Sequence, residues 1–202
     1  TYANFRLDAL WRESLIHTSA YLKHDPEPTS WRHVRGFNLG LCMRDGMHDE
    51  YLGFCRVLVA SLLIDLLNSG RLGLGDPDVL LENVFMEMGE WSKQDGYRMP
   101  RGTVFSITTL GRGTSKSCYP ELSSTFKAAS VKTVCLYLAK KVLDLHEPGD
   151  NHSKLRSTCA WAYADWLRTL DVSDRVFLPT QRDHAARSGR LFLITYQTLA
   201  EE

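Results

Sequence analysis

Asp45, His48 and Asp49 lie together in the stretch LCMRDGMHDEYLGF, residues 41–54, and are residue types that bind metal ions. Carboxylate oxygens suit Mg²⁺ and Mn²⁺, whereas imidazole suits zinc, copper and iron. Three interpretations follow. Asp45 is a catalytic acid at the end of a strand, His48-Asp49 is a metal-binding pair, or the stretch is a turn into a core helix.

The first interpretation depends on the residues before Asp45. Residues 37–44 are short and partly apolar, which predicts a strand, and Gly46 follows Asp45 at once. A carboxylate at the C-terminal end of a strand is where two-metal phosphoryl-transfer enzymes hold their ions. The competing interpretation is that Asp45 caps the next turn, and the spacing alone favours neither.

The second interpretation is a helical metal phosphohydrolase, in which an HD pair shares one metal with further His and Asp ligands. His24-Asp25 is a second such dipeptide, and His33, His146 and His152 are further candidates. None of these three histidines follows a strong core-facing helical stripe, so the signal is weak.

A third motif, VFSITTLGRGTSKS, imitates a phosphate-binding loop and fails in two details. Ser115 stands where that loop needs Gly before Lys116. Pro120 prevents a helix from beginning where its dipole would face a phosphate.

Apolar periodicity predicts a mainly α fold with one or two short strands near the N-terminus. Residues 49–67 are apolar nearly all round, which is typical of a core helix, and Asp76-Pro77 is a helix start. RGTVFSITTL, residues 101–110, has the composition of a strand. Other helices are predicted over residues 4–23, 131–145, 155–170 and from about 182 onward.

Composition excludes several classes of protein. Hydrophobic residues are 44% of the 202-residue chain and the formal net charge is zero, which favours a globular domain without an overall basic footprint. Five cysteines without a CxxC spacing predict buried thiols in a reducing compartment, hence an intracellular protein, nuclear or cytoplasmic. Arg56 and Asp65 interrupt the longest apolar run, so no membrane span is predicted. The first and last residues lack a start and a helix stop, which predicts a fragment of a longer protein.

Charge is unevenly distributed along the chain. Residues 76–95 hold six acids and one lysine, whereas residues 112–141 hold six basic residues and one acid. A basic segment either lines a phosphate backbone or is a solvated helix face. The candidates for nucleic-acid contact are Arg112, Lys116, Lys127 and Lys132.

Several short motifs resemble one known family. They are Trp11-Arg12, Pro26 to Trp31, Gly36, Asp45-Gly46-Met47-His48, Leu52-Gly53, Lys116, Tyr119-Pro120-Glu121-Leu122, Lys127-Ala128-Ala129 and Leu191 to Ala200. Together they resemble the transposase-like proteins abundant in dinoflagellate genomes, relatives of RNase H-fold DDE transposases of the CACTA type. In that family a D-x-M-H motif is followed by Leu-Gly.

The resemblance implies that Asp45 is the second of three catalytic acids and that His48 seats the turn or touches metal or DNA. Residues 1–48 would then hold an N-terminal helix and the strand-end acid, and residues 49–202 a helical insertion in the RNase H-like fold. Mg²⁺ or Mn²⁺ and DNA would be the cofactor and partner. The first and third acids have no convincing counterpart in this chain, so the expected function is a transposase fragment that is inactive alone.

The alternative function is a non-catalytic helical interaction domain, with a homo-oligomer as one option. Trp161 and Trp166 cannot both face the core comfortably, which predicts a partner groove on the exposed face of residues 153–170.

Overall fold

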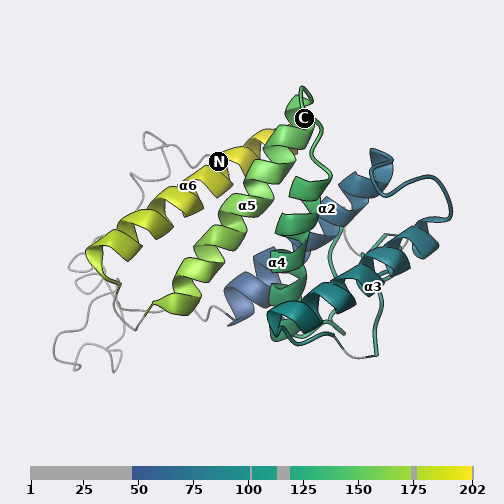
Figure 1. Ribbon diagram of the computed structural model, residues 1–202, viewed down its shortest axis with the longest axis horizontal. Helices are drawn as coiled ribbons and strands as arrows, with labels where there is room; N and C mark the ends of the chain where they lie inside the picture. The colour runs from purple at the N-terminus through teal and green to yellow at the C-terminus, as the bar shows by residue number, and fades with distance from the viewer. Residues whose placement is uncertain (1–46, 101, 113–118, 174–176, 202) are drawn as a thin grey trace, which may run out of the picture. The chain divides into compact units, whose positions relative to one another are not determined.

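The computed structural model holds one compact unit that begins at residue 46 and runs to residue 202. It describes residues 47–100, 102–112, 119–173 and 177–201, without the side chains of residues 47–50. These ranges contain helices and no strand. The elements in Figure 1 are the π-helix η4 (Met47–Phe54) and the α-helices α2 (Cys55–Asn68), α3 (Pro77–Asp95), α4 (Ala128–Asp144), α5 (Asn151–Val172) and α6 (Pro179–Glu201).

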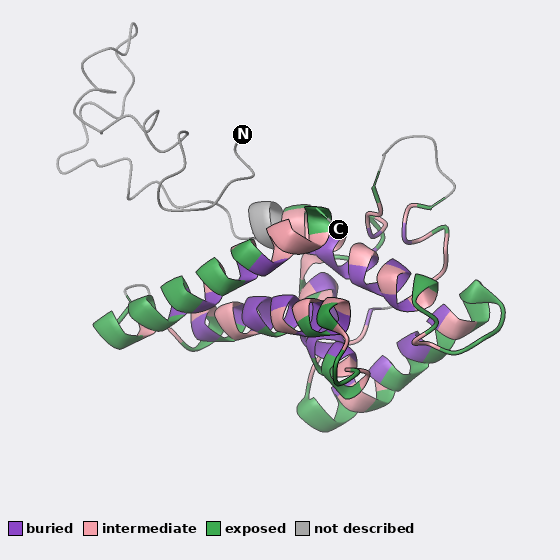
Figure 2. Cartoon of the chain, turned by 90° about the horizontal axis from the view of Figure 1, so that it is seen from above, coloured by how far each residue is buried: buried purple, intermediate pink, exposed green. Residues whose placement is uncertain are grey.

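Helix α2 is the core helix that its sequence predicts. It continues directly from η4, and its leucines and valines are mostly buried, as the purple positions in Figure 2 show. It packs against α3 and α4. It ends at Asn68, and Gly70 then takes a positive φ of 67° that suits glycine. Burial on most sides explains why the apolar pattern has no single stripe.

The beginning of α3 also agrees with its prediction. The Asp76 side chain accepts a hydrogen bond from the amide of Asp78 at 2.8 Å, and Pro77 occupies the first helical position. This arrangement satisfies an amide that would otherwise have no partner within the helix. Helix α3 packs on α2 and α4, and its outer face is exposed and acidic.

Helices α5 and α6 pack along each other, and α5 also packs on α4. Aromatic rings fill the junction with the end of η4: the Phe54 ring lies 5.2 Å from Phe192 and 5.0 Å from Tyr196. Tyr163 of α5 joins the same cluster, 4.7 Å from Phe192. These rings bury large apolar areas where the chain's early and late elements meet.

The strand predicted over residues 101–110 is wrong for its described part, residues 102–110, which form loop and turn. The hydroxyl of Thr109 accepts from the Ser106 amide at 2.8 Å and donates to the Val104 carbonyl, so side chains supply the bonds that a strand ladder would have made. Phe105 is buried against Phe85 and Phe126. Its apolar character therefore serves a loop that covers the core.

The mainly α class is confirmed for the residues that the structure describes. The helix expected over residues 4–23 and the strand expected over 37–44 lie outside them. In the described ranges one helical stretch, Tyr51–Asn68, is long and apolar enough to cross a membrane by length and composition alone. The packing of α2 on α3 and α4 gives this stretch the environment of a core helix.

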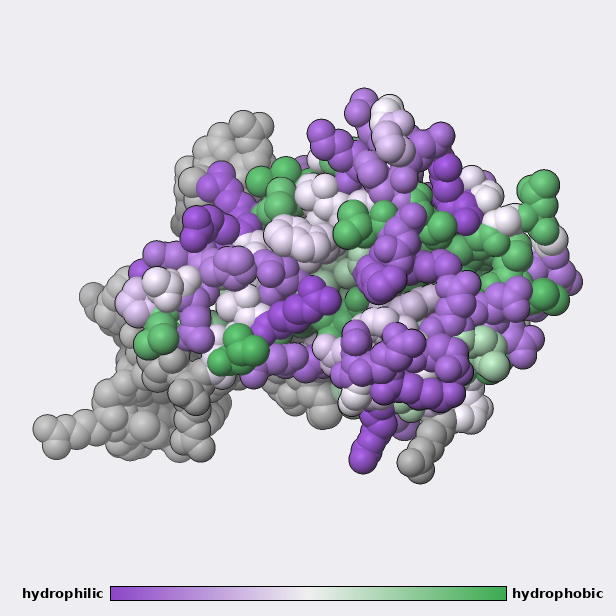
Figure 3. Space-filling view, in the orientation of Figure 1, coloured by the Kyte–Doolittle hydropathy of each residue, from purple (hydrophilic) through white to green (hydrophobic). Residues whose placement is uncertain are grey.

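The described surface mixes polar and apolar side chains. On the face drawn in Figure 3, hydrophobic groups emerge between hydrophilic ones. Single exposed hydrophobic residues are ordinary. Three of them, Leu143, Trp161 and Leu191, lie together beside one concavity.

Candidate functional site

The best-defined concave site of the described residues is a cavity of about 240 Å³ between α2, α5 and α6. Leu58 and Leu62 of α2 and Leu199 of α6 provide apolar walls. Asp65 of α2 and His152 of α5 supply polar groups at one side. A mostly apolar cavity with a few converging polar groups is the usual form of a small-molecule site.

An ion pair between α2 and α5 forms the polar side of this cavity. Nη1 of Arg156 donates to Oδ2 of Asp65 at 2.9 Å, and Nε2 of His152 lies 3.0 Å from Oδ1 of the same carboxylate. Arg156 is 1% exposed, whereas the Asp65 side chain is 32% exposed. A guanidinium this deeply buried needs its carboxylate partner to offset the loss of water.

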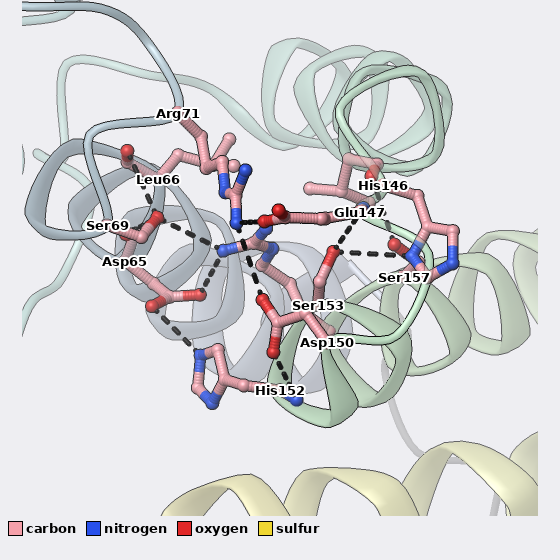
Figure 4. Close-up of polar contacts among 12 residues, drawn as sticks. Asp65, Leu66, Ser69, Arg71, His146, Glu147, Asp150, His152, Ser153 and Ser157 are labelled. Carbon is pink, nitrogen blue, oxygen red and sulfur yellow. Dashed lines mark hydrogen bonds and ion pairs between the residues drawn. The ribbon is translucent and has the colours of Figure 1, made fainter.

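The ion pair extends into a wider network, shown in Figure 4. Arg71, just after α2, pairs with Glu147 and Asp150 in the connection between α4 and α5. The hydroxyl of Ser153 accepts from the Glu147 amide at 3.0 Å and lies 3.3 Å from Nδ1 of His146. The network fixes the C-terminal end of α2 against the start of α5.

Three donors in this network have no hydrogen-bond partner: Nε of Arg71, and Nε and Nη2 of Arg156. They do not create an anion site, because three carboxylates surround the two guanidinium groups. Those carboxylates belong to Asp65, Glu147 and Asp150. With neutral histidines the cluster carries an excess of negative charge, which would repel a phosphate or carboxylate.

The Asp65–His152 pair has the elements of an acid–base dyad, in which a carboxylate orients an imidazole. The same carboxylate is already held by the buried Arg156, which lowers its capacity to stabilise a charged imidazole. A role in fixing the helices agrees better with this geometry than a role in catalysis does.

The described residues do not test the predicted metal ligands Asp45 and His48. Asp45 lies outside the described residues, and His48 is described only as backbone within η4. Within the described ranges no group of three His, Cys, Asp or Glu side chains could hold a metal ion.

The candidate nucleic-acid residues differ in their surroundings. Arg112 and Lys127 are exposed, and Lys116 lies outside the described residues. Lys132 pairs with Asp171 and lies over the Tyr51 ring, 5.9 Å from its centre. Of the other basic residues in that segment, Lys140 pairs with Asp144 and Lys141 with Glu87. Most of the predicted basic face is thus neutralised by neighbouring acids.

A second concavity, a groove of about 370 Å³, runs along α5 between the end of α4 and α6. Leu143 and Leu191 line it on either side of Trp161, and Lys154 lies at one end. Trp161 is 45% exposed, whereas Trp166 packs on the core and on Gly189. The expectation that only one of the two tryptophans faces the core is confirmed.

Arg156 and its partners were not predicted from the sequence, although the sequence contains a signal for them. Asp65 interrupts an apolar run, and Arg156 follows Leu155 at the start of a core-facing stripe. A charged residue at a buried helical position requires a partner of opposite charge. Two such residues in one chain could have been paired on that ground.

Comparison with known proteins adds no relative. No protein-family model matches the chain, and no curated protein or solved structure matches it.

Proposed function

We propose that residues 47–201 are the helical insertion of a transposase-like protein, placed directly after its second catalytic acid, Asp45. The supporting observation is positional. The described residues that follow Asp45 in the chain, from Met47 to Glu201, form successive helices with no strand among them. An insertion between the second and third acids of an RNase H-like fold would be helical in this way.

In this proposal residues 47–201 bind the DNA and hold it in position, and the catalytic acids outside these residues carry out the reaction. Arg112 and Lys127 are exposed and form no salt bridge with a described acid, and in this proposal they supply phosphate contacts. Lys127 directly precedes α4, whereas Arg112 lies beside Pro77 at the start of α3. The chain has one catalytic acid of three and does not cleave DNA by itself.

Calorimetric titration of Mn²⁺ into a longer chain, which also carries the first and third acids, tests the role of Asp45. We expect binding heat that disappears in Asp45→Asn and persists in His48→Ala. Asp95→Asn, an exposed acid at the end of α3, is the matched control and should bind as the original chain does.

Two outcomes would contradict the proposal. Binding that survives Asp45→Asn but is lost in His48→Ala would favour a helical phosphohydrolase. The absence of any Mn²⁺ binding would exclude Asp45 as a metal ligand and would favour the second candidate function, a helical protein-interaction domain.

The second candidate is a helical protein-interaction domain, and the groove around Trp161 favours it. A tryptophan exposed beside Leu143 and Leu191 is the kind of anchor that protein interfaces bury. Binding of an apolar fluorescent dye should fall in Trp161→Glu and remain in Trp166→Phe, because Trp166 packs on the core. Equal dye binding by all three chains would exclude the groove as the accessible apolar site.

A further inference from the structure

Helix α5 carries a basic residue on either side of Trp161: Lys154, which lines the groove, and Arg168, which lies further along the helix. Lys154 and Arg168 lie seven residues before and after Trp161, so the three share one side of the helix. Both basic residues are exposed, and neither forms an ion pair with another described residue. The groove therefore suits an apolar side chain flanked by acids.

The outer face of α3 carries the opposite pattern. Met86 is 61% exposed, and Glu82 and Glu90 lie four residues before and after it, on the side away from the buried face. Val79, 54% exposed, lies seven residues before Met86 on the same face. Glu82 makes no ion pair within the described residues, whereas Glu90 pairs with Lys93.

One copy of the chain cannot bring these two surfaces together. Helix α3 packs on α2 and α4, whereas the groove is formed by the end of α4 with α5 and α6. Figure 1 shows α4 and α5 lying between α3 and α6. Both surfaces are thus presented to solvent at once.

We propose that a second copy of this chain occupies the groove with its helix α3. Met86 of one copy would insert between Leu143 and Leu191 against Trp161, and Glu82 would approach Lys154 or Arg168 according to the direction of the helix. An amphipathic helix with anchors at such spacings is a common occupant of an apolar groove.

The contact joins different surfaces of the two copies, so it is heterologous. A pair of copies retains a free groove on one copy and a free α3 face on the other, and association continues head to tail into a ring or an open chain. The proposal rests on the second candidate function and names its partner. It is independent of metal binding by Asp45.

Sedimentation equilibrium of the 202-residue chain, from micromolar to high-micromolar concentration, measures the association. We expect an average mass that rises above the 23.0 kDa of one chain, and less so in high salt. Trp161→Glu and Met86→Glu should each remain monomeric. Arg98→Glu, the same kind of charge change at an exposed site outside both surfaces, should associate like the original chain.

Mixing the two monomeric variants separates a heterologous contact from any other. Trp161→Glu keeps an intact α3 face and Met86→Glu keeps an intact groove, so the mixture should form dimers of twice the chain mass and nothing larger. A symmetric contact between like surfaces would instead be lost in only one variant: a contact between two grooves would survive Met86→Glu, and a contact between two α3 faces would survive Trp161→Glu.

Charge exchange tests the pairing of acids with bases. Lys154→Glu and Glu82→Lys should each weaken association by roughly two- to fivefold, the range of a surface ion pair. One of two double variants, Glu82→Lys with Lys154→Glu or Glu82→Lys with Arg168→Glu, should recover part of the loss, according to the direction of the bound helix. A chain that stays monomeric at every concentration, or association that both glutamate variants leave unchanged, would overturn the proposal. Circular dichroism of each variant shows whether its helices are retained.

Discussion

At the scale of single residues, the two partners of the Asp65–Arg156 pair differ in burial, and this sets what each contributes. The guanidinium is almost fully enclosed, while a third of the Asp65 side chain reaches solvent. Removal of the carboxylate leaves a buried charge without its partner. Removal of the guanidinium leaves a carboxylate that water and His152 still solvate.

Asp65→Asn should therefore lower the free energy of unfolding by about 2–4 kcal/mol, and Arg156→Met by only about 1–2 kcal/mol. Urea denaturation followed by circular dichroism measures both. Arg182→Met is the control, because Arg182 and Asp183 form an exposed pair, and it should change stability by less than about 0.5 kcal/mol. If Asp65→Asn and Arg156→Met lowered the free energy of unfolding equally, the two partners would not contribute unequally as their burial predicts.

The buried thiols also have a consequence that can be measured. Burial raises the pKa of Cys159 from 9.0 to about 12, against the lowering effect of a hydrogen bond with Thr195. A hydrogen bond with Cys55, together with burial, raises the pKa of Cys135 well above its usual value. Between pH 9 and 12 the unfolded chain has released the Cys159 proton and the folded chain has kept it, so stability falls as pH rises.

One such thiol contributes a slope of at most about 1.4 kcal/mol per pH unit inside that window. Urea denaturation at several pH values above 9 should therefore show a shallower decline for Cys159→Ala than for the original chain. If stability fell with pH at the same slope in both chains, the Cys159 thiol would have the same pKa in the folded and the unfolded state.

Only some residues of the candidate sites could be predicted from the sequence. The exposure of one tryptophan of the Trp161–Trp166 pair was predictable, because both cannot lie on one buried stripe. The network around Arg156 was not predicted, because its members come from α2, α5 and the connection before α5, and only the fold brings them together.

At the scale of elements, the loop before α4 is held by a close backbone approach. A Cβ at Gly111 would lie 2.9 Å from the Glu121 carbonyl oxygen and 3.1 Å from its nitrogen, and the φ of Gly111 is 75°. The Glu121 amide also donates to the Leu110 carbonyl at 3.1 Å. Glycine is needed there for space as well as for conformation.

Gly96, the C-cap of α3, provides a matched comparison. It has a φ of 73°, and a Cβ there would meet nothing within 4 Å. Gly96→Ala should cost about 1 kcal/mol for the left-handed conformation alone, and Gly111→Ala about 1–2 kcal/mol more because backbone must move. Thermal unfolding of both variants measures the difference. Similar melting temperatures would mean that the Glu121 backbone yields without strain.

Helices were the predictable elements, because their apolar spacing and caps are local. Asp76, Pro77 and the apolar stripe of α4 mark boundaries that the structure reproduces closely. The segment over residues 101–110 was mispredicted, because β-type composition does not distinguish a strand from a loop whose apolar residues cover a core. Hydrogen bonds between Ser106 and Thr109 decide that case locally.

At the scale of the whole molecule, a formal net charge of zero conceals a separation of charge. The acids of α3 face solvent, while Arg112 and Lys127 are basic groups exposed elsewhere on the chain. This separation permits contact with a phosphate backbone in spite of a neutral total. The predicted transposase-like role depends on such contact.

Fluorescence anisotropy of a labelled DNA duplex, titrated with the 202-residue chain, tests that role most directly. We expect binding that weakens as salt rises, because counterions are released from the phosphates. The double variant Arg112→Glu with Lys127→Glu should weaken it further, and Lys154→Glu, in the groove of α5, should leave it unchanged. Absence of DNA binding at low salt, or equal binding by the double variant, would contradict the transposase-like role.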